Sequence, residues 1–171
     1  MLNNSHKLIL RRAVERFPQR PCMGKRTVDP KTKTAGEFQF HNYETAYKKI
    51  KQFAAGLRHL GVQPHQHLGI YSRNRIEWQI ASEACHTQSI VTIALYDTLG
   101  EEASLFIMNH GEIVCLCIGA NEFKPTMKIA PQCQYLKHVI TFDKLEEAQI
   151  EEAKKLGLTI HHQDEVEKLG A

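Results

Sequence analysis

The chain has 171 residues, of which 42% are hydrophobic and 24% are charged, and its formal net charge is +3. This length is sufficient to bury a core, and the composition is typical of a globular domain rather than a disordered chain. The small net charge gives no indication of a nucleic-acid partner. No apolar run approaches the roughly 20 residues that a membrane-spanning helix needs, and no secretory signal precedes the domain.

The N-terminal end is more basic than the rest of the chain. Residues 1–34 carry many Lys and Arg residues, whereas Glu15 and Asp29 are their only acids. Such an end can contact an anionic membrane surface, and it can equally be the solvated flank of a soluble domain. We therefore expect a protein that is soluble or peripherally attached to a membrane.

The five cysteines show no spacing typical of a disulfide framework or a zinc site. Cys115 and Cys117 alternate within an apolar run, which places both on one face of a strand. Odd numbers of buried, reduced thiols are typical of intracellular proteins, so we expect an intracellular chain.

The first 61 residues predict a helix, a hairpin and a second helix. Apolar residues at helical spacing, a polar Asp-Pro loop and a glycine stop signal support this order. The expected elements are a helix at Lys7–Phe17, strands at Pro21–Thr27 and Glu37–His41, and a helix capped by Asn42 that ends before Gly61.

Residues 62–171 alternate between strand and helix patterns. We expect strands at His67–Tyr71, Ile90–Tyr96, Ile113–Ile118, Val139–Phe142 and Leu158–His161. The intervening helices are expected to begin at the capping boxes Asn74-x-x-Glu77 and Thr98-x-x-Glu101, to cover about 121–130 and 144–156, and to close with Asp164–Leu169. The run Ile90–Tyr96 is nearly all apolar and indicates a strand covered on both faces.

Strands that alternate with helices on this spacing predict a parallel sheet with helices on both faces, because parallel neighbours need long crossovers. The expected fold class is therefore α/β, with an N-terminal helix and a β-hairpin before the sheet.

Residue patterns alone give no catalytic constellation. Gly24-Lys25-Arg26-Thr27 lacks the glycine and the Ser or Thr of a phosphate loop, and no strand is followed by G-x-G-x-x-G. No G-x-S-x-G elbow is present. The pairs His65-x-His67 and His161-His162 have no Cys or carboxylate cluster beside them at ligand spacing, so strand-end positions explain them better than a metal.

Two further features favour structural roles over chemical ones. Asp97 and Glu101 can act as acid and base, but turn and cap chemistry accounts for them more simply. Trp78, the single tryptophan, lies at helical spacing beside Ile76 and Ile80, so we expect it to pack against the sheet rather than to stack on a nucleotide.

Several motifs resemble long-chain acyl-CoA synthetases, which belong to the adenylate-forming superfamily. The resemblance runs in order along nearly the whole chain. It rests on Arg20-Pro21-Cys22-Met23-Gly24, Ala55-Gly56-Leu57-Arg58-x-Leu60-Gly61-Val62, Asn74-Arg75-x-Glu77-Trp78, Leu95-Tyr96-Asp97-Thr98-Leu99-Gly100 and Glu165-Val166-Glu167-x-Leu169-Gly170. Ile76 stands where the family usually has proline.

The resemblance implies a partial N-terminal AMP-binding domain over residues 1–171, with a leading segment at 1–61 and a βα sheet at 62–171. ATP, Mg²⁺ and CoA are implied for the complete enzyme. The family's phosphate loop, its later acidic residues and its C-terminal lid have no matching positions here, so no catalytic, cofactor or metal residue can be carried over. Tyr96, Asp97 and Thr98 are expected near substrate, at the carboxyl end of a central strand.

The expected function is that of an N-terminal part of an ATP-dependent long-chain fatty-acid–CoA ligase, inactive alone. Its partners would be a long-chain fatty acid, ATP and CoA, and no nucleic acid. The alternative is a non-enzymatic binding or scaffold module derived from that family. An exposed apolar face would favour self-association. The resemblance places such a protein in the cytosol or on the cytosolic face of the endoplasmic reticulum, mitochondria or peroxisomes.

Overall fold

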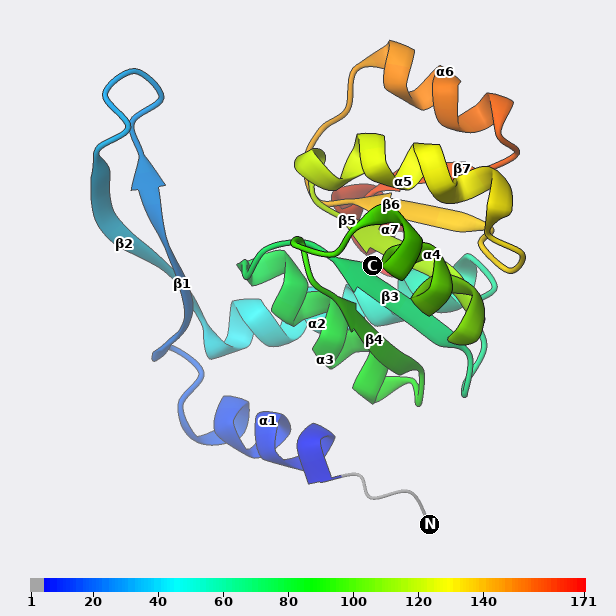
Figure 1. Cartoon of the computed structure of the whole chain (residues 1–171). Helices are drawn as coiled ribbons and strands as arrows, with labels where there is room; N and C mark the ends of the chain where they lie inside the picture. The colour runs from blue at the N-terminus through cyan, green and yellow to red at the C-terminus, as the bar shows by residue number, and fades with distance from the viewer. Residues whose placement is uncertain (1–4) are drawn as a thin grey trace.

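The structure is a computed structural model that describes residues 5–171, with side chains from residue 9 onward. The leading segment forms a helix, an antiparallel hairpin and a long helix (Figure 1). These elements are α1 (Ser5–Arg16), β1 (Pro21–Val28), β2 (Ala35–Asn42) and α2 (Tyr43–His59). The expected order of elements is confirmed, although the side chains of Lys7 and Leu8, on which the predicted faces of the first helix partly rest, lie outside the described residues.

The remaining elements alternate as expected. They are β3 (His67–Tyr71), α3 (Ile76–Thr87), β4 (Val91–Leu95), α4 (Glu101–His110), β5 (Ile113–Ile118), η1 (Ala120–Glu122), α5 (Phe123–Ile129), η2 (Ala130–Gln132), β6 (His138–Thr141), α6 (Glu147–Lys155), β7 (Thr159–His162) and α7 (Gln163–Leu169). The five strands of the second part form one parallel sheet in the order β4-β3-β5-β6-β7. The α/β prediction is therefore confirmed.

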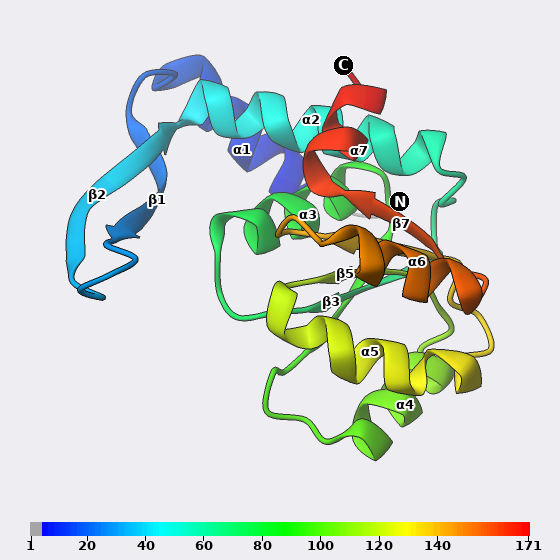
Figure 2. The same ribbon diagram turned by 90° about the horizontal axis from the view of Figure 1, so that it is seen from above.

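Helices cover both faces of this sheet (Figure 2). One face packs under α2, α3 and α7 through a core that includes Leu68, Ile70 and Cys117. The other face packs against α4, α5 and α6 through a second core that includes Leu116 and Val139. Side chains on a strand point alternately to opposite faces, which explains how β5 supplies both cores.

The strand β4 differs from its prediction. It lies at the edge of the sheet, and Val91 and Ala94 are exposed. The prediction of a strand covered on both faces is wrong among the described residues. The apolar run was taken as a sign of central burial, but β-branched residues also suit the half-buried surface of an edge strand.

Helix starts are partly as predicted. The side chain of Asn42 accepts a hydrogen bond from the Thr45 amide at 2.8 Å, so the cap of α2 is confirmed. The two expected capping boxes are wrong, because α3 and α4 begin after Arg75 and Gly100 and neither has a side-chain cap. Capping boxes instead open α6 and α7.

The hairpin extends away from the sheet (Figure 1). Phe38 and Phe40 stack with their ring centroids 5.7 Å apart, and both side chains are more than half exposed. The ring of Phe40 lies against Gly24, where a Cβ would come within 2.5 Å of it. An isolated two-stranded hairpin is marginally stable in water, so this cross-strand packing contributes to keeping it formed.

Candidate functional site

The strand order reverses between β3 and β5. The chain runs from β3 to β4 on one side and then returns to β5 on the other side of β3. The loops that follow these two strands diverge from the same edge, and the Gly119 amide donates to the Tyr71 carbonyl across the gap at 3.3 Å. Open parallel sheets bind ligands outside the carboxyl ends of their strands at such a point. We therefore take this edge as the candidate site.

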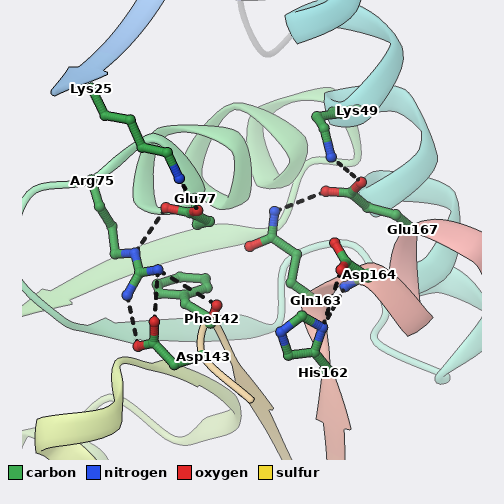
Figure 3. A network of polar contacts seen from close by, with 10 residues as sticks. All are labelled: Lys25, Lys49, Arg75, Glu77, Phe142, Asp143, His162, Gln163, Asp164 and Glu167. Carbon is green, nitrogen blue, oxygen red and sulfur yellow. Dashed lines mark hydrogen bonds and ion pairs between the residues drawn. The ribbon is translucent and has the colours of Figure 1, made fainter. Parts of the chain in front are cut away.

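Arg75, directly before α3, is the centre of the polar network at this edge (Figure 3). Its guanidinium donates to Glu77 at 2.8 Å and to both carboxylate oxygens of Asp143 at 2.8 and 3.0 Å. Asp143 also accepts from the Ala120 amide at 2.9 Å. The arginine therefore ties the loop after β3 to the loops after β5 and β6.

The charges in this network stabilise one another. Burial alone would lower the pKa of Arg75, but its hydrogen bonds to Asp143 and Glu77 outweigh this effect and raise the pKa above its ordinary value. Burial would also raise the pKa of Glu77, but the Arg75 hydrogen bond and the Lys25 charge lower it. The Arg75 hydrogen bond is the main cause that lowers the pKa of Asp143. All three groups are therefore charged at neutral pH.

Glu122 is a buried carboxylate at the same edge. It is only 6% exposed, and no described side chain donates to it. Its Oε2 is close enough to Gly119 that a Cβ there would come within 2.5 Å of it, with the Ser72 hydroxyl nearby. Burial raises the pKa of Glu122, and the charge of Asp97 raises it further. This side chain can therefore take up a proton more readily than an ordinary glutamate.

The three residues expected near substrate lie on the loop after β4. Tyr96 is 73% exposed, and Asp97 and Thr98 are also exposed. Asp97 accepts from Arg73 at 3.1 Å, which joins this loop to the loop after β3. Because β4 is an edge strand, the expected position on a central strand is wrong. The three residues lie one strand away from the point at which the strand order reverses.

A second part of the network joins α2 to α7 (Figure 3). Lys49 donates to Glu167 at 2.7 Å, and the Gln163 amide nitrogen donates to the other carboxylate oxygen at 2.8 Å. The ring of His162 accepts from the Asp164 amide and so caps α7. A small pocket of about 140 Å³ lies between these residues and Glu77.

Metal and thiol chemistry gain no support within residues 5–171. No group of three or more His, Cys, Asp or Glu side chains there could hold a metal ion. Cys85, Cys115 and Cys117 are free and fully buried. Burial raises the pKa of Cys85 to about 12, and it also raises the pKa values of the other two. These thiols stay protonated and behave as core residues.

Sequence reasoning missed the roles of Arg75, Glu122 and Gln163. An arginine directly before a helix with a glutamate two residues later was a usable signal for the first. Glu122 follows a buried strand and a glycine, but only the fold shows that its carboxylate lacks a partner. Trp78 was interpreted correctly, since it packs against the core beneath α3.

The fold and this edge define an α/β domain of the class that binds ligands at the carboxyl ends of a parallel sheet. Residues 10–169 match the family model described as AMP-binding enzyme, and the chain belongs to that family. Within the described residues, no helix is both long enough and apolar enough to span a membrane.

The known relatives are acyl-activating proteins by name. The chain is 35% identical over 163 residues to Long chain acyl-CoA synthetase 5 of Arabidopsis thaliana, which covers 95% of this chain and 24% of the relative. It therefore spans about a quarter of the length of such relatives.

Two solved structures share the fold. One is the adenylation domain of a carboxylate reductase from Mycobacterium chelonae, with a TM-score of 0.83 and 13% identity over 99% of this chain and 29% of that domain. The other is a long-chain-fatty-acid-CoA ligase from Archaeoglobus fulgidus, with a TM-score of 0.75 and 16% identity over 98% of this chain and 30% of that chain.

Proposed function

We propose that this chain forms part of an ATP-dependent long-chain fatty-acid–CoA ligase. The observation that carries the proposal is the similarity to a long-chain acyl-CoA synthetase across 95% of the chain, together with the family match over residues 10–169. In this proposal residues 1–61 are the leading segment of a partial N-terminal AMP-binding domain, and residues 62–171 are its βα sheet.

The complete enzyme would join a long-chain fatty acid to AMP from ATP and then pass the acyl group to CoA. Mg²⁺ would neutralise phosphate charge during the first step. The donor set within residues 5–171 does not fit a bound metal ion, because no three candidate ligands gather there. We therefore assign no Mg²⁺ ligand to this part of the chain and derive no step through the ion.

The part proposed for this chain is to shape one wall of the substrate crevice. Tyr96, Asp97 and Thr98 would lie close to the substrate, because they follow a strand at the carboxyl edge of the sheet. The ion pair between Arg73 and Asp97, at 3.1 Å, supports this by fixing the loop after β4 against the loop after β3. No catalytic residue is proposed here.

A second candidate is a non-enzymatic binding or scaffold module. The exposed edge strand favours it, since Val91 at 43% and Tyr96 at 73% exposure leave apolar surface beside unpaired strand edge groups. Such a module would self-associate through this face or bind a partner there. We place either protein in the cytosol or on the cytosolic face of the endoplasmic reticulum, mitochondria or peroxisomes, with peripheral membrane contact through the basic N-terminal end.

Fatty-acid-dependent ATP–pyrophosphate exchange on the purified 171-residue chain tests the first proposal. We expect no exchange, because the sequence has no loop able to hold ATP phosphates. Clear exchange would overturn the assignment of inactivity. Sedimentation and thermal melting of the same sample address the second candidate: a monodisperse, cooperatively melting protein favours the module, and an aggregating or molten chain argues against it.

A further inference from the structure

Gln163 carries a buried hydrogen-bond acceptor without a partner. The side chain is 3% exposed, and its Nε2 donates to Glu167 Oε1 at 2.8 Å. This bond fixes the orientation of the amide, since only the nitrogen can donate to a carboxylate. Oε1 therefore faces the opposite way, and no described residue donates to it. Leaving such an acceptor unpaired is costly, so a native structure normally supplies a donor.

The unpaired oxygen faces a polar pocket. In Figure 3 it points away from Glu167, toward the side on which Glu77 and Phe142 lie. The pocket there has a volume of about 140 Å³ and is lined by Gln163, Glu77, Lys49 and Asp164 among others. This volume corresponds to roughly four water molecules in the liquid, at about 30 Å³ each. It therefore accepts a small polar group rather than a cofactor.

The pocket has more free acceptors than free donors. Lys49 is already paired with Glu167 at 2.7 Å, so it is not available to a ligand. Glu77 Oε1 has only the Lys25 ammonium near it, at 4.0 Å, which is too long for a hydrogen bond. The Asp164 carboxylate lies 3.6 Å from a histidine ring and is otherwise unpaired.

We propose that this pocket binds a small primary ammonium group, such as that of a short alkylamine or amino alcohol. An ammonium group has three donors and no acceptor, which matches the free oxygens of Gln163, Glu77 and Asp164. The positive charge suits the two carboxylates, and the volume limits the ligand to about four heavy atoms. This site lies between α2, α3 and α7, and it is separate from the Tyr96–Thr98 loop.

Nuclear magnetic resonance of the Gln163 side-chain amide, with methylammonium chloride as the probe, tests the proposal. Tetramethylammonium chloride at the same ionic strength carries the same charge but has no N–H donor. We expect a saturable shift of the Gln163 resonance with methylammonium and none with tetramethylammonium. Equal responses to the two salts, or no saturable response to either, would show that water alone occupies the pocket and would overturn the proposal.

Substitutions identify the groups that bind. Gln163→Met keeps the length of the side chain and removes the acceptor, so we expect binding, followed through neighbouring backbone amides, to weaken about tenfold or more. Gln134→Met, at an exposed position, is the matched control and should bind normally. If Gln163→Met does not fold, Glu77→Gln tests the same site with Gln163 intact. Unchanged binding in Gln163→Met or in Glu77→Gln contradicts the site.

Discussion

Lys49 and Glu167 are 118 positions apart in the sequence and form a 2.7 Å ion pair between α2 and α7. The carboxylate is nearly buried, with 9% of its side chain exposed, whereas the lysine side chain is 31% exposed. The pair therefore closes the domain by joining its first long helix to its last helix. Without Lys49, the remaining donor to Glu167 would be Gln163.

Lys49→Met should destabilise the fold by about 2 kcal/mol, because it leaves a buried carboxylate without its counter-ion. Urea unfolding at neutral pH measures this change. Lys48→Met, at the exposed neighbouring position, is the control and should have little effect. The double variant Lys49→Met, Glu167→Met should recover most of the loss, because it removes both charges. A loss in the double variant as large as in the single one would contradict the pairing.

Gly56→Ala should cost about 1–3 kcal/mol, because a Cβ at this position would overlap the Val166 carbonyl of α7. The corresponding fall in the melting temperature is several degrees. Gly100→Ala is the matched control, since nothing lies within 4 Å of a Cβ there and its φ is −69°. If the melting temperature of Gly56→Ala equals that of the native chain, α2 and α7 are not packed as described.

Glu122→Gln should stabilise the protein at neutral pH. Burial raises the folded-state pKa of Glu122 above its unfolded value of about 4.3. The stabilisation from its protonation is therefore fully present below the unfolded pKa and is lost as the pH rises through the folded pKa. We expect the variant to exceed the native chain in urea unfolding at pH 7 and to match it near pH 3. A variant less stable than the native chain at pH 7 would show that the Glu122 charge is needed.

Arg75→Met should destabilise the domain by about 2 kcal/mol at pH 7, because it leaves Glu77 and Asp143 without their shared donor. The folded pKa of Asp143 is lowered, so this contribution is present above the unfolded value of about 3.9 and is lost as the pH falls through the folded pKa. Unfolding curves at pH 7 and at strongly acidic pH should therefore converge. Arg73→Met removes one exposed ion pair and should cost less than about 1 kcal/mol. Equal losses in the two variants would contradict the network.

The periodic segments could be predicted from the sequence. Alternating strand and helix patterns gave the right element order, and the Asn42 cap and the stop at Gly61, which has φ +89°, were predicted correctly. Cys115 and Cys117 lie on one face of β5, as their spacing indicates. These features depend on local backbone geometry, which neighbouring residues determine.

Features that depend on contacts between distant residues could not be predicted. The edge position of β4 depends on which strand pairs with β3, and an apolar run does not specify that choice. Glu101 pairs with Lys128 at 2.7 Å rather than capping α4, so a tertiary ion pair replaced the expected local bond. The free carbonyl of Gln163 likewise results from the bond between its amide and Glu167.

The most direct test of the proposed function is a chimaera. Residues 10–169 of this chain would replace the matching segment of Long chain acyl-CoA synthetase 5 of Arabidopsis thaliana, and palmitoyl-CoA formation from palmitate, ATP and CoA would be measured. We predict a folded chimaera with fatty-acid-dependent activity, which Asp97→Ala reduces. A chimaera that folds and melts cooperatively but forms no palmitoyl-CoA would contradict the assignment of this chain to a working long-chain ligase.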